Sequence, residues 1–577
     1  MSDLRIWAPR VTQLEIELVD HDERITMSRS AQGVFTAPAP TTCAYMLRAD
    51  GDRIVDPWAR AVDTVLGPCR WVDHTAFTWT DQTFAAKPLA AAVIYELHIG
   101  TYTDEGTFDG AADHLSELAA LGITHVELMP VATFSGARGW GYDGAALFAP
   151  LAAYGGPDGL KRLVARAHAL GLAVLLDVVY NHLGPIGNYL ENLGPFFRAD
   201  RQTPWGSAVN VDGPDNEEVR RFFIDNALSW LRDYHFDGLR IDAVHAIEDQ
   251  SARPFLEQLH DEVEALSVRL DRSLVVIAES DLNDPRVIRT IENHGLGMDA
   301  QWSADFHHAL HVLLTGETSG YYADFAFEPM HLLARALQNG FVYAGQYSPY
   351  RKRAHGRALG DVSLGKLIGF AQNHDQIGNR TCGERLSQLV SPDQLTLAMT
   401  LVLTAPFIPM LFMGEEWGAS TPFIFFTDHQ DQDIAEATRE GRRRDFVASG
   451  WKPQDVPDPQ AKATFALCKL RRAERGTSPH RELHAYTHAL IALRTRAADL
   501  SAGSPVHVSV DGLLLCMRRG RYVVYANFGA GPLTLAESGT LELASHAEVK
   551  RVREAWVVPG NTAAVFDRGE AFGPCDL

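Results

Sequence analysis

Hydrophobic residues at the start of the chain follow a strand-like pattern. Residues 1–85 alternate short apolar runs with turn residues and show no helical period. The runs read "LRIWAP", "LEIELV", "RITMS" and "AYMLRADG". Short strands separated by turns are typical of small all-β domains. The pattern therefore predicts an N-terminal β-sandwich over residues 1–88.

The pattern changes near residue 89. From there, short apolar runs recur, and most are followed by amphipathic helical segments such as 160–167 and 223–234. Near-continuous apolar strands that alternate with helices indicate a parallel sheet covered by helices, which is an α/β fold. Eight such runs predict a closed (β/α)₈ TIM barrel over residues 89–500. The predicted strands are 93–99, 125–131, 173–180, 238–244, 274–279, 297–302, 367–373 and 408–413.

Two further segments complete the predicted organisation. Residues 180–215 are rich in Gly, Pro and Asn, so we expect an extra loop domain over the top of the barrel. Residues 481–500 have the pattern of a final helix. Short apolar runs separated by Gly, Asn and Pro then return, among them "VHVSV" and "YVVYANF". They predict a second all-β domain over residues 501–577.

Charge and cysteine usage narrow the possible partners and location. The formal net charge of −21 argues against nucleic acid and anionic membranes as partners, because both require basic surface. The six cysteines are far apart and form no CxxC pair, which suits a reducing compartment. The start "MSDLRIWAPR" has no signal-peptide pattern, and no run of about 20 apolar residues is present. We therefore expect a cytoplasmic protein.

Polar residues follow the predicted strands at the ends where a barrel carries its active site. Any one of these groups alone would be equally well explained as a structural ion pair. Four such groups at corresponding strand ends indicate a functional site instead. The groups are Asp177, Asn181 and His182; Arg240, Asp242 and His245; Glu279; and Asn373, His374 and Asp375.

The residue types suit glycoside hydrolysis, which needs an ionised carboxylate under the anomeric carbon and a carboxylic acid beside the leaving oxygen. Arg240 and Asp242 are two apart in a strand and share a face, so the guanidinium is expected to hold Asp242 ionised. Glu279 follows the apolar run "LVVIA" and is expected to stay protonated. Asp375 would be a third carboxylate that grips sugar hydroxyls, with His182 and His374 as hydrogen-bond donors.

These segments resemble the four ordered sequence regions of the α-amylase superfamily, glycoside hydrolase family 13. The matching segments are "DVVYNH" (177–182), "GLRIDAVH" (238–245), "VVIAES" (275–280) and "FAQNHD" (370–375). The resemblance implies Asp242 as nucleophile, Glu279 as general acid/base and Asp375 as transition-state stabiliser. It also implies that Tyr142 of "GWGYDG" stacks under the sugar, although ordinary loop packing is the alternative for that residue. A retaining enzyme would place the carboxyl groups of Asp242 and Glu279 about 5–5.5 Å apart.

Other motifs resemble one branch of this superfamily. "LRIWAP" and "DPWAR" resemble the N-terminal domain of branching and debranching enzymes and of maltooligosyltrehalose trehalohydrolases. "TPWGSAVNVDGP" (203–214), "AESDLNDP" (278–285), "LFMGEEWGASTPFIFFTDH" (411–429) and "EGRRRDF" (440–446) resemble the trehalohydrolases most. That resemblance implies hydrolysis of the α-1,4 bond next to a terminal trehalose, together with functional pairing with a maltooligosyltrehalose synthase. Trp205, Glu415, Trp417 and Phe426 either line the trehalose pocket or pack among barrel loops.

Several alternatives remain open at the level of the sequence. A branching enzyme usually has Ser before the His-Asp of the last region, whereas this chain has "QNHDQ". A transglycosylase would use the same three carboxylates, and a non-catalytic glucan-binding protein would be expected to have lost one of them. In the N-terminal sandwich, Trp7 and Trp58 either stack on sugars or, as tryptophan more often does, are buried. No dense Asp/Asn cluster is visible, so we predict neither a metal nor another cofactor.

Overall fold

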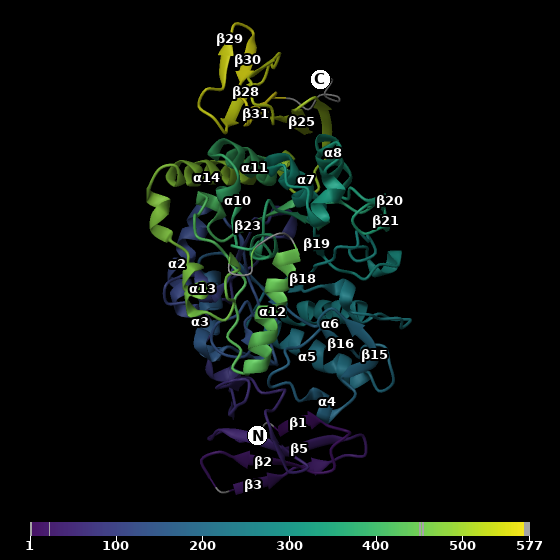
Figure 1. Ribbon diagram of the computed structural model, residues 1–577. Helices are drawn as coiled ribbons and strands as arrows, with labels where there is room; N and C mark the ends of the chain where they lie inside the picture. The colour runs from purple at the N-terminus through teal and green to yellow at the C-terminus, as the bar shows by residue number, and fades with distance from the viewer. Residues whose placement is uncertain (1–2, 22, 449–451, 453–454, 570–577) are drawn as a thin grey trace.

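The computed structural model describes residues 3–21, 23–448, 452 and 455–569. Figure 1 shows the N-terminal strands at one end of the molecule, the C-terminal strands at the other and the helices around the barrel between them. The N-terminal strands form two sheets, as the alternating pattern predicts. One is β1 (Asp3–Trp7), β5 (Val34–Pro38) and β4 (Ser28–Arg29); the other is β3 (Glu23–Thr26), β2 (Leu14–Leu18), β6 (Tyr45–Ala49), β9 (Cys69–Arg70) and β8 (Ala61–Val62), with β7 (Asp52–Ile54) paired to β6.

Eight parallel strands close into a barrel, so the predicted fold class is confirmed. Each strand lies within one of the eight predicted ranges. The strands are apolar on both faces because one face lines the barrel interior and the other packs against helices. In order they are β10 (Ile94–Leu97), β11 (His125–Leu128), β14 (Ala173–Val178), β17 (Gly238–Ile241), β18 (Val275–Ala278), β19 (Ala300–Trp302), β22 (Leu367–Gly369) and β23 (Ile408–Phe412).

Helices surround the barrel and bury their apolar faces against it. The first long one shows how the sequence sets the ends: Thr107 accepts a hydrogen bond from the Gly110 N–H at its start, and Gly122 takes a left-handed φ of 97° at its end. The long helices are α2 (Phe108–Leu121), α3 (Gly156–Ala169), α5 (Glu217–Asp233), α6 (Phe255–Leu270), α7 (Ala304–Thr315), α8 (Pro329–Asn339), α11 (Pro392–Thr404), α12 (Gln432–Ala448) and α14 (His480–Arg496).

The connections between strands and helices carry short additional elements. The predicted insertion at 180–215 contains a short helix and an antiparallel hairpin of β15 and β16. A second hairpin, β20 with β21, lies between α8 and the seventh barrel strand. These elements are α1 (Ile99–Tyr102), α4 (Leu190–Leu193), α9 (His374–Gly378), α10 (Leu386–Leu389), α13 (Lys462–Leu467), β12 (Ala132–Thr133), β13 (Ala146–Pro150), β15 (Phe197–Thr203), β16 (Gly206–Val209), β20 (Ala344–Ser348) and β21 (Arg353–Gly356).

The C-terminal part is all-β, as the sequence predicts. Its larger sheet packs against the barrel helices, with α11 contacting β31 and α8 contacting β24. The five strands of this sheet are β24 (His507–Asp511), β25 (Leu514–Arg519), β26 (Tyr522–Asn527), β31 (Thr562–Asp567) and β28 (Thr540–Ala544), and the smaller sheet is β27 (Leu533–Leu535), β30 (Ala555–Val558) and β29 (Lys550–Val552). The predicted domain boundaries at 88 and 500 fall between these groups of strands and stay predictions.

Aromatic side chains join the N-terminal sheets to the barrel. Trp7 is buried, with its ring centroid 5.5 Å from that of Phe196 in the insertion. Trp58 is half-buried and presents an edge to Phe222 of α5, 4.9 Å between centroids. The interpretation of Trp7 as a buried tryptophan is therefore confirmed. No helix of the described residues is both long and apolar enough to cross a membrane.

The segment around Asp81, which leads into the barrel, is held in place by a cluster of ion pairs. Asp81 accepts hydrogen bonds from His168 Nδ1 and His235 Nδ1, both at 2.8 Å. The other ring nitrogen of His168 lies 2.9 Å from an oxygen of Asp237. Because both partners of His168 are carboxylates, both ring nitrogens donate and the ring is an imidazolium. Burial lowers the pKa of His168, but the hydrogen bonds to Asp237 and Asp81 outweigh burial and raise it.

Asp81→Asn is expected to weaken docking of this segment by about 2–3 kcal/mol, because it removes one carboxylate from a buried imidazolium. The raised pKa fixes the sign with pH. The contribution of His168 is fully present below pH about 6.5 and is lost as pH rises through its raised folded pKa. Thermal melting of both proteins across pH 5–9 measures this. The loss should be largest at low pH, whereas Asp109→Asn, which breaks an exposed pair with Arg162, should change little.

Candidate active site

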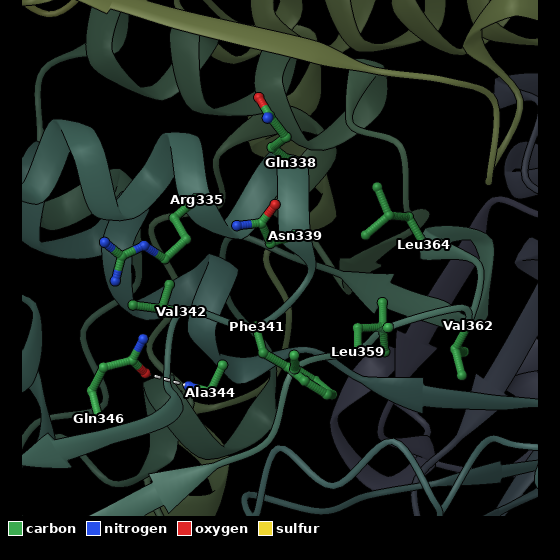
Figure 2. Close-up of a pocket in the computed structure, with 12 residues that line it drawn as sticks. Arg335, Gln338, Asn339, Phe341, Val342, Ala344, Gln346, Leu359, Val362 and Leu364 are labelled. Carbon is green, nitrogen blue, oxygen red and sulfur yellow. Dashed lines mark hydrogen bonds between the residues drawn. The ribbon is translucent and has the colours of Figure 1, made fainter.

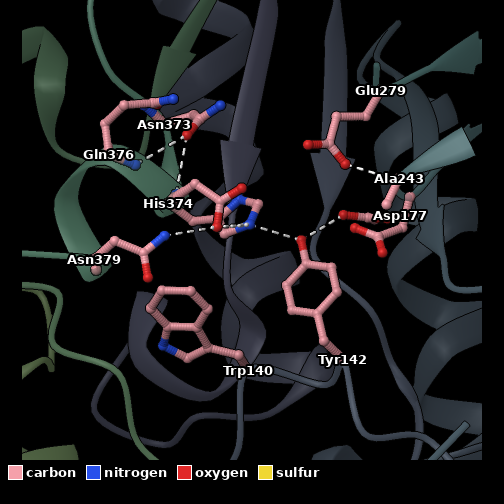
Figure 3. A network of polar contacts seen from close by, with 12 residues as sticks. Trp140, Tyr142, Asp177, Ala243, Glu279, Asn373, His374, Gln376 and Asn379 are labelled. Atoms are coloured by element: carbon pink, nitrogen blue, oxygen red, sulfur yellow. Dashed lines mark hydrogen bonds and ion pairs between the residues drawn. The ribbon is translucent and has the colours of Figure 1, made fainter. Parts of the chain in front are cut away.

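The predicted strand ends meet at one mouth of the barrel. β14, β17 and β18 are neighbours, and Asp177 is in register with Arg240. Figure 3 shows Tyr142, Asp177, Glu279 and His374 converging on this mouth from different elements. The structure thus brings together the side chains that the sequence placed at separate strand ends.

Arg240 is the centre of this cluster and is fully buried. Its Nη1 donates to both oxygens of Asp177 at 2.8 and 2.7 Å, and to Asp242 Oδ1 at 2.9 Å. Its Nη2 lies 3.0 Å from Glu279 Oε2, as an ion pair without hydrogen-bond alignment. The guanidinium stacks on Trp302, 4.1 Å from the ring centroid. One planar cation therefore fixes three carboxylates, which a flexible lysine would not do.

The backbone after Asp242 is bent to serve the same cluster. Ala243 has a left-handed φ of 39°, which costs a non-glycine residue about 1–3 kcal/mol. This conformation points its N–H at Glu279 Oε2, 2.8 Å away. The next N–H, of Val244, donates to the Glu279 carbonyl oxygen at 2.9 Å. The strained turn therefore ties the Glu279 side chain and backbone to the strand that carries Asp242.

The directions of the pKa shifts in this cluster are opposite to the sequence-based expectation. Burial raises the pKa of Asp242 well above its usual range in spite of Arg240. Burial also raises the pKa of Glu279, but Arg240 and the Ala243 N–H outweigh it, so that pKa is lowered. The sequence predicted Asp242 ionised and Glu279 protonated. The pKa directions run the other way because one oxygen of Glu279, one strand away, accepts the Ala243 N–H and lies 3.0 Å from Arg240 Nη2, contacts that the sequence pattern does not reveal.

A chain of hydrogen bonds links this cluster to the seventh strand. The Tyr142 hydroxyl donates to Asp177 Oδ2 at 2.6 Å and accepts from His374 Nε2 at 2.9 Å (Figure 3). His374 Nδ1 donates to Glu96, whose second oxygen accepts the His374 backbone N–H at 3.1 Å. Burial lowers the pKa of His374, but Glu96 and Asp375 outweigh it and raise it to about 9. His374 is therefore a buried cation that fixes the orientation of Tyr142.

Asp375 stands at the start of α9. Asn373 caps this helix, and its side chain accepts the Asp375 N–H at 2.9 Å. The Asp375 side chain is 39% exposed, and its Oδ1 lies 3.5 Å from His374 Nε2. Burial raises the pKa of Asp375, although His374 opposes the change. The cap thus holds a partly solvated carboxylate at the mouth, where a sugar hydroxyl can reach it.

The remaining predicted binding residues occupy the rim. His182 and Trp205 form a stacked pair with centroids 5.4 Å apart, and Trp205 is 47% exposed on the β15–β16 hairpin. Burial lowers the pKa of His182 to about 4, so this ring is neutral. His245 Nε2 lies 3.8 Å from Asp281 Oδ1, and the charge of His245 is one of the smaller causes that lower the pKa of Glu279. Their roles in substrate binding stay predictions.

Three residues considered for a trehalose pocket are fully packed. Glu415, Trp417 and Phe426 are each at most 2% exposed. Glu415 accepts the Phe412 N–H at 2.9 Å, and burial raises its pKa to about 8. The alternative of ordinary loop packing therefore applies to these three, and of the original set only Trp205 is accessible.

Two residues of the site were missed in the sequence. Glu96 holds His374, and Trp302 supports Arg240. Glu96 carried a usable signal, since it is a charged residue inside the apolar run "VIYELHI", as Arg240 and Asp242 are inside theirs. Within the described residues, no group of three or more His, Cys, Asp or Glu side chains is arranged to hold a metal ion, and no disulfide joins the five described cysteines. Cys575 lies outside the described residues.

Comparison with known proteins places this geometry in a family. The family described as "Alpha amylase, catalytic domain" matches residues 68–193. A malto-oligosyltrehalose trehalohydrolase of Mycobacterium tuberculosis is 44% identical over 94% of this chain and 95% of its own length. A malto-oligosyltrehalose trehalohydrolase of Arthrobacter ramosus is 43% identical over 97% of this chain and 98% of its own length. A crystal structure of a protein assigned as an alpha amylase, from Salmonella typhimurium, is 36% identical with a TM-score of 0.89, over 98% of this chain and 97% of that one.

The full-length matches cover both flanking all-β parts as well as the barrel, and the barrel carries the three carboxylates at its mouth. The chain is therefore a glycoside hydrolase, and it belongs to the malto-oligosyltrehalose trehalohydrolase family of the α-amylase superfamily.

Proposed function

We propose that the protein hydrolyses the α-1,4 bond next to the terminal trehalose of maltooligosyltrehalose and releases free trehalose. The observation that carries the chemistry is the buried Arg240, which contacts Asp177, Asp242 and Glu279 at the barrel mouth. The substrate rests on family membership, since the relatives named above are trehalohydrolases over nearly the whole chain.

The proposed reaction has two steps. Asp242 attacks the anomeric carbon of the maltooligosyl unit, while Glu279 gives its proton to the glycosidic oxygen and the bond to trehalose breaks. A covalent glycosyl ester on Asp242 remains. Glu279, now ionised, takes a proton from water as that water attacks the same carbon and releases Asp242. Two inversions leave the configuration unchanged.

The first step requires the proton on Glu279 and the charge on Asp242, the reverse of the preference described above. Both carboxyl groups contact the same guanidinium. Moving one proton from Asp242 to Glu279 leaves the net charge of this cluster unchanged. A sugar ring seated over Asp242 brings the glycosidic oxygen to Glu279 and gives that proton an acceptor. The pH profile should therefore show two apparent pKa values that belong to the pair rather than to single residues.

The stereochemistry gives a direct test of this mechanism. The α-anomer of the maltooligosaccharide is expected as the first-formed product, because a covalent intermediate on Asp242 requires two inversions at the anomeric carbon. Proton NMR in the first minutes of the reaction, before mutarotation, distinguishes the two anomers. An initial β-anomer would exclude the covalent step and would require a single displacement by water.

Substrate preference tests the proposed function itself. We expect kcat/KM to be at least about 100-fold higher for maltotriosyltrehalose than for maltopentaose, a linear chain of equal length. Trehalose has no reducing end and its second ring turns back, so a site shaped for that turn leaves polar groups unpaired against a linear chain. Chromatography of the products should give trehalose and maltotriose in equal amounts.

Other outcomes of that experiment identify the alternatives. Equal efficiency on the two pentasaccharides would indicate an amylase. New α-1,6 branches after incubation with amylose would indicate a branching enzyme, and longer transfer products would indicate a transglycosylase. We also propose that the substrate is supplied by a maltooligosyltrehalose synthase in the cytoplasm, in line with the expected reducing compartment.

A further inference from the structure

A cleft of about 680 Å³ separates the N-terminal sheets from helix α5, away from the catalytic mouth. It is larger than the crevice of about 480 Å³ beside α8 in Figure 2. That crevice is flanked by exposed side chains such as Arg335 and Gln338. The side-chain oxygen of Gln346 already accepts a hydrogen bond from the Ala344 N–H. The larger cleft has a more specific lining, and its volume is typical of small-molecule sites.

Two tryptophans contribute to the wall of the cleft. Trp71 and Trp58 both line it, and both are half-buried. Trp58 packs edge-on against Phe222 and so is held in place. An indole fixed at the wall of a solvent-connected cleft offers an apolar surface with a polar N–H at one end. Such a surface complements the C–H face of a sugar ring beside its hydroxyl groups.

Polar atoms in the same cleft have no partner among the described residues. Arg60 Nη1 is buried without a hydrogen bond, and its guanidinium is held over the Phe148 ring at 4.4 Å. Both ring nitrogens of His74 are likewise buried and unbonded. Burial lowers the pKa of His74 to about 4, so the ring is neutral and offers one donor and one acceptor. Buried polar atoms without a hydrogen bond destabilise the fold. A hydroxyl group can both accept a hydrogen bond from such a donor and donate one to such an acceptor.

The charges of the cleft do not select for an ionic ligand. Four arginines and four aspartates line it. Several are already neutralised: Arg70 makes two hydrogen bonds of 2.9 Å to Asp63, and Arg232 makes two to Asp233 at 2.6 and 2.7 Å. A phosphate or a cation would meet charge of its own sign as often as the opposite sign. A neutral polyhydroxy ligand is the class that this lining accepts.

We propose that this cleft is a second carbohydrate-binding site, which takes a neutral α-glucan segment between Trp71 and Arg60. Only the identity of the glucan rests on the proposed function; the ligand class follows from the lining. The site would hold a distal part of a long substrate chain, and shorter substrates would not reach both sites.

The test uses the full chain with the Asp242→Asn change, so that the ligand is not consumed. Calorimetric titration with maltoheptaose should show two binding sites. Trp71→Ala and, separately, Arg60→Met should raise the Kd of one site by at least about tenfold, or about 1.4 kcal/mol, and leave the other unchanged. Arg53→Met is the matched control, since Arg53 lies on the same sheets but pairs with Glu17 outside the cleft. Thermal melting checks that each variant is folded.

The proposal is overturned if the parent protein binds no maltoheptaose, or if neither Trp71→Ala nor Arg60→Met weakens any maltoheptaose site of the parent protein. Failure here is separable from failure of the proposed function. If the cleft binds no glucan but the unmodified protein still releases trehalose from maltotriosyltrehalose, only the second site is lost. If maltoheptaose binds in the cleft but no trehalose is released, the second site stands and the proposed reaction is wrong.

Discussion

Asp242→Asn is expected to lower kcat on maltotriosyltrehalose by about 10⁴-fold or more, because the neutral amide is a much weaker nucleophile than a carboxylate and forms no glycosyl ester. The fold should survive. The amide oxygen can still accept the Arg240 hydrogen bond that Asp242 Oδ1 receives at 2.9 Å. Steady-state assay of trehalose release measures the loss, and calorimetry with the same substrate checks that binding is retained.

A matched variant separates the nucleophile from the acid. Glu279→Gln should also be slow on maltotriosyltrehalose, by about 10²–10⁴-fold. With a glycosyl fluoride as substrate, the leaving group needs no proton, so the first step of this variant should recover. Asp242→Asn should not recover. Turnover by Asp242→Asn within tenfold of the parent on either substrate would contradict the assignment.

The barrel was predictable because its strands are short apolar runs between amphipathic segments. A run such as "AVLLDVVY" is buried on both faces in a parallel barrel and therefore stands out in the sequence. The order of the strands around the barrel followed from the fold class, since consecutive β/α units close in sequence order. The hairpin of Phe197–Thr203 with Gly206–Val209 was not predicted, because the strands are short and the Gly, Pro and Asn residues of the insertion obscured their pattern.

The three carboxylates were also predictable, because each ends a different strand and charge is rare in such strands. Their protonation was not. The lowered pKa of Glu279 depends on the Ala243 N–H at 2.8 Å and Arg240 Nη2 at 3.0 Å from one oxygen, and neither contact can be read from the strand pattern. The ion-pair cluster at Asp81 was not predictable either, because its partners His168 and His235 are distant in sequence.

The second large effect is expected at Arg240, where Arg240→Lys keeps the charge but removes the planar fork. An ammonium group cannot contact Asp177, Asp242 and Glu279 together, so at least one buried carboxylate loses its partner. Unfolding free energy should fall by about 3 kcal/mol. Arg220→Lys is the matched control, because Arg220 is a buried arginine of α5 that binds Asp249 at 3.0 Å outside the site.

The pH dependence distinguishes this catalytic positioning from a structural role. Arg240 lowers the pKa of both Asp242 and Glu279, opposing the effect of burial. In Arg240→Lys both values should therefore rise, and the whole bell of kcat/KM against pH should move to higher pH, with its maximum reduced by about 100-fold or more. Arg220→Lys should lose stability, but its profile of kcat/KM against pH should not shift. If the maximum of kcat/KM for Arg240→Lys falls while the pH of the maximum stays the same, the guanidinium only supports the fold. The proton on the Asp242–Glu279 pair is then placed by burial alone.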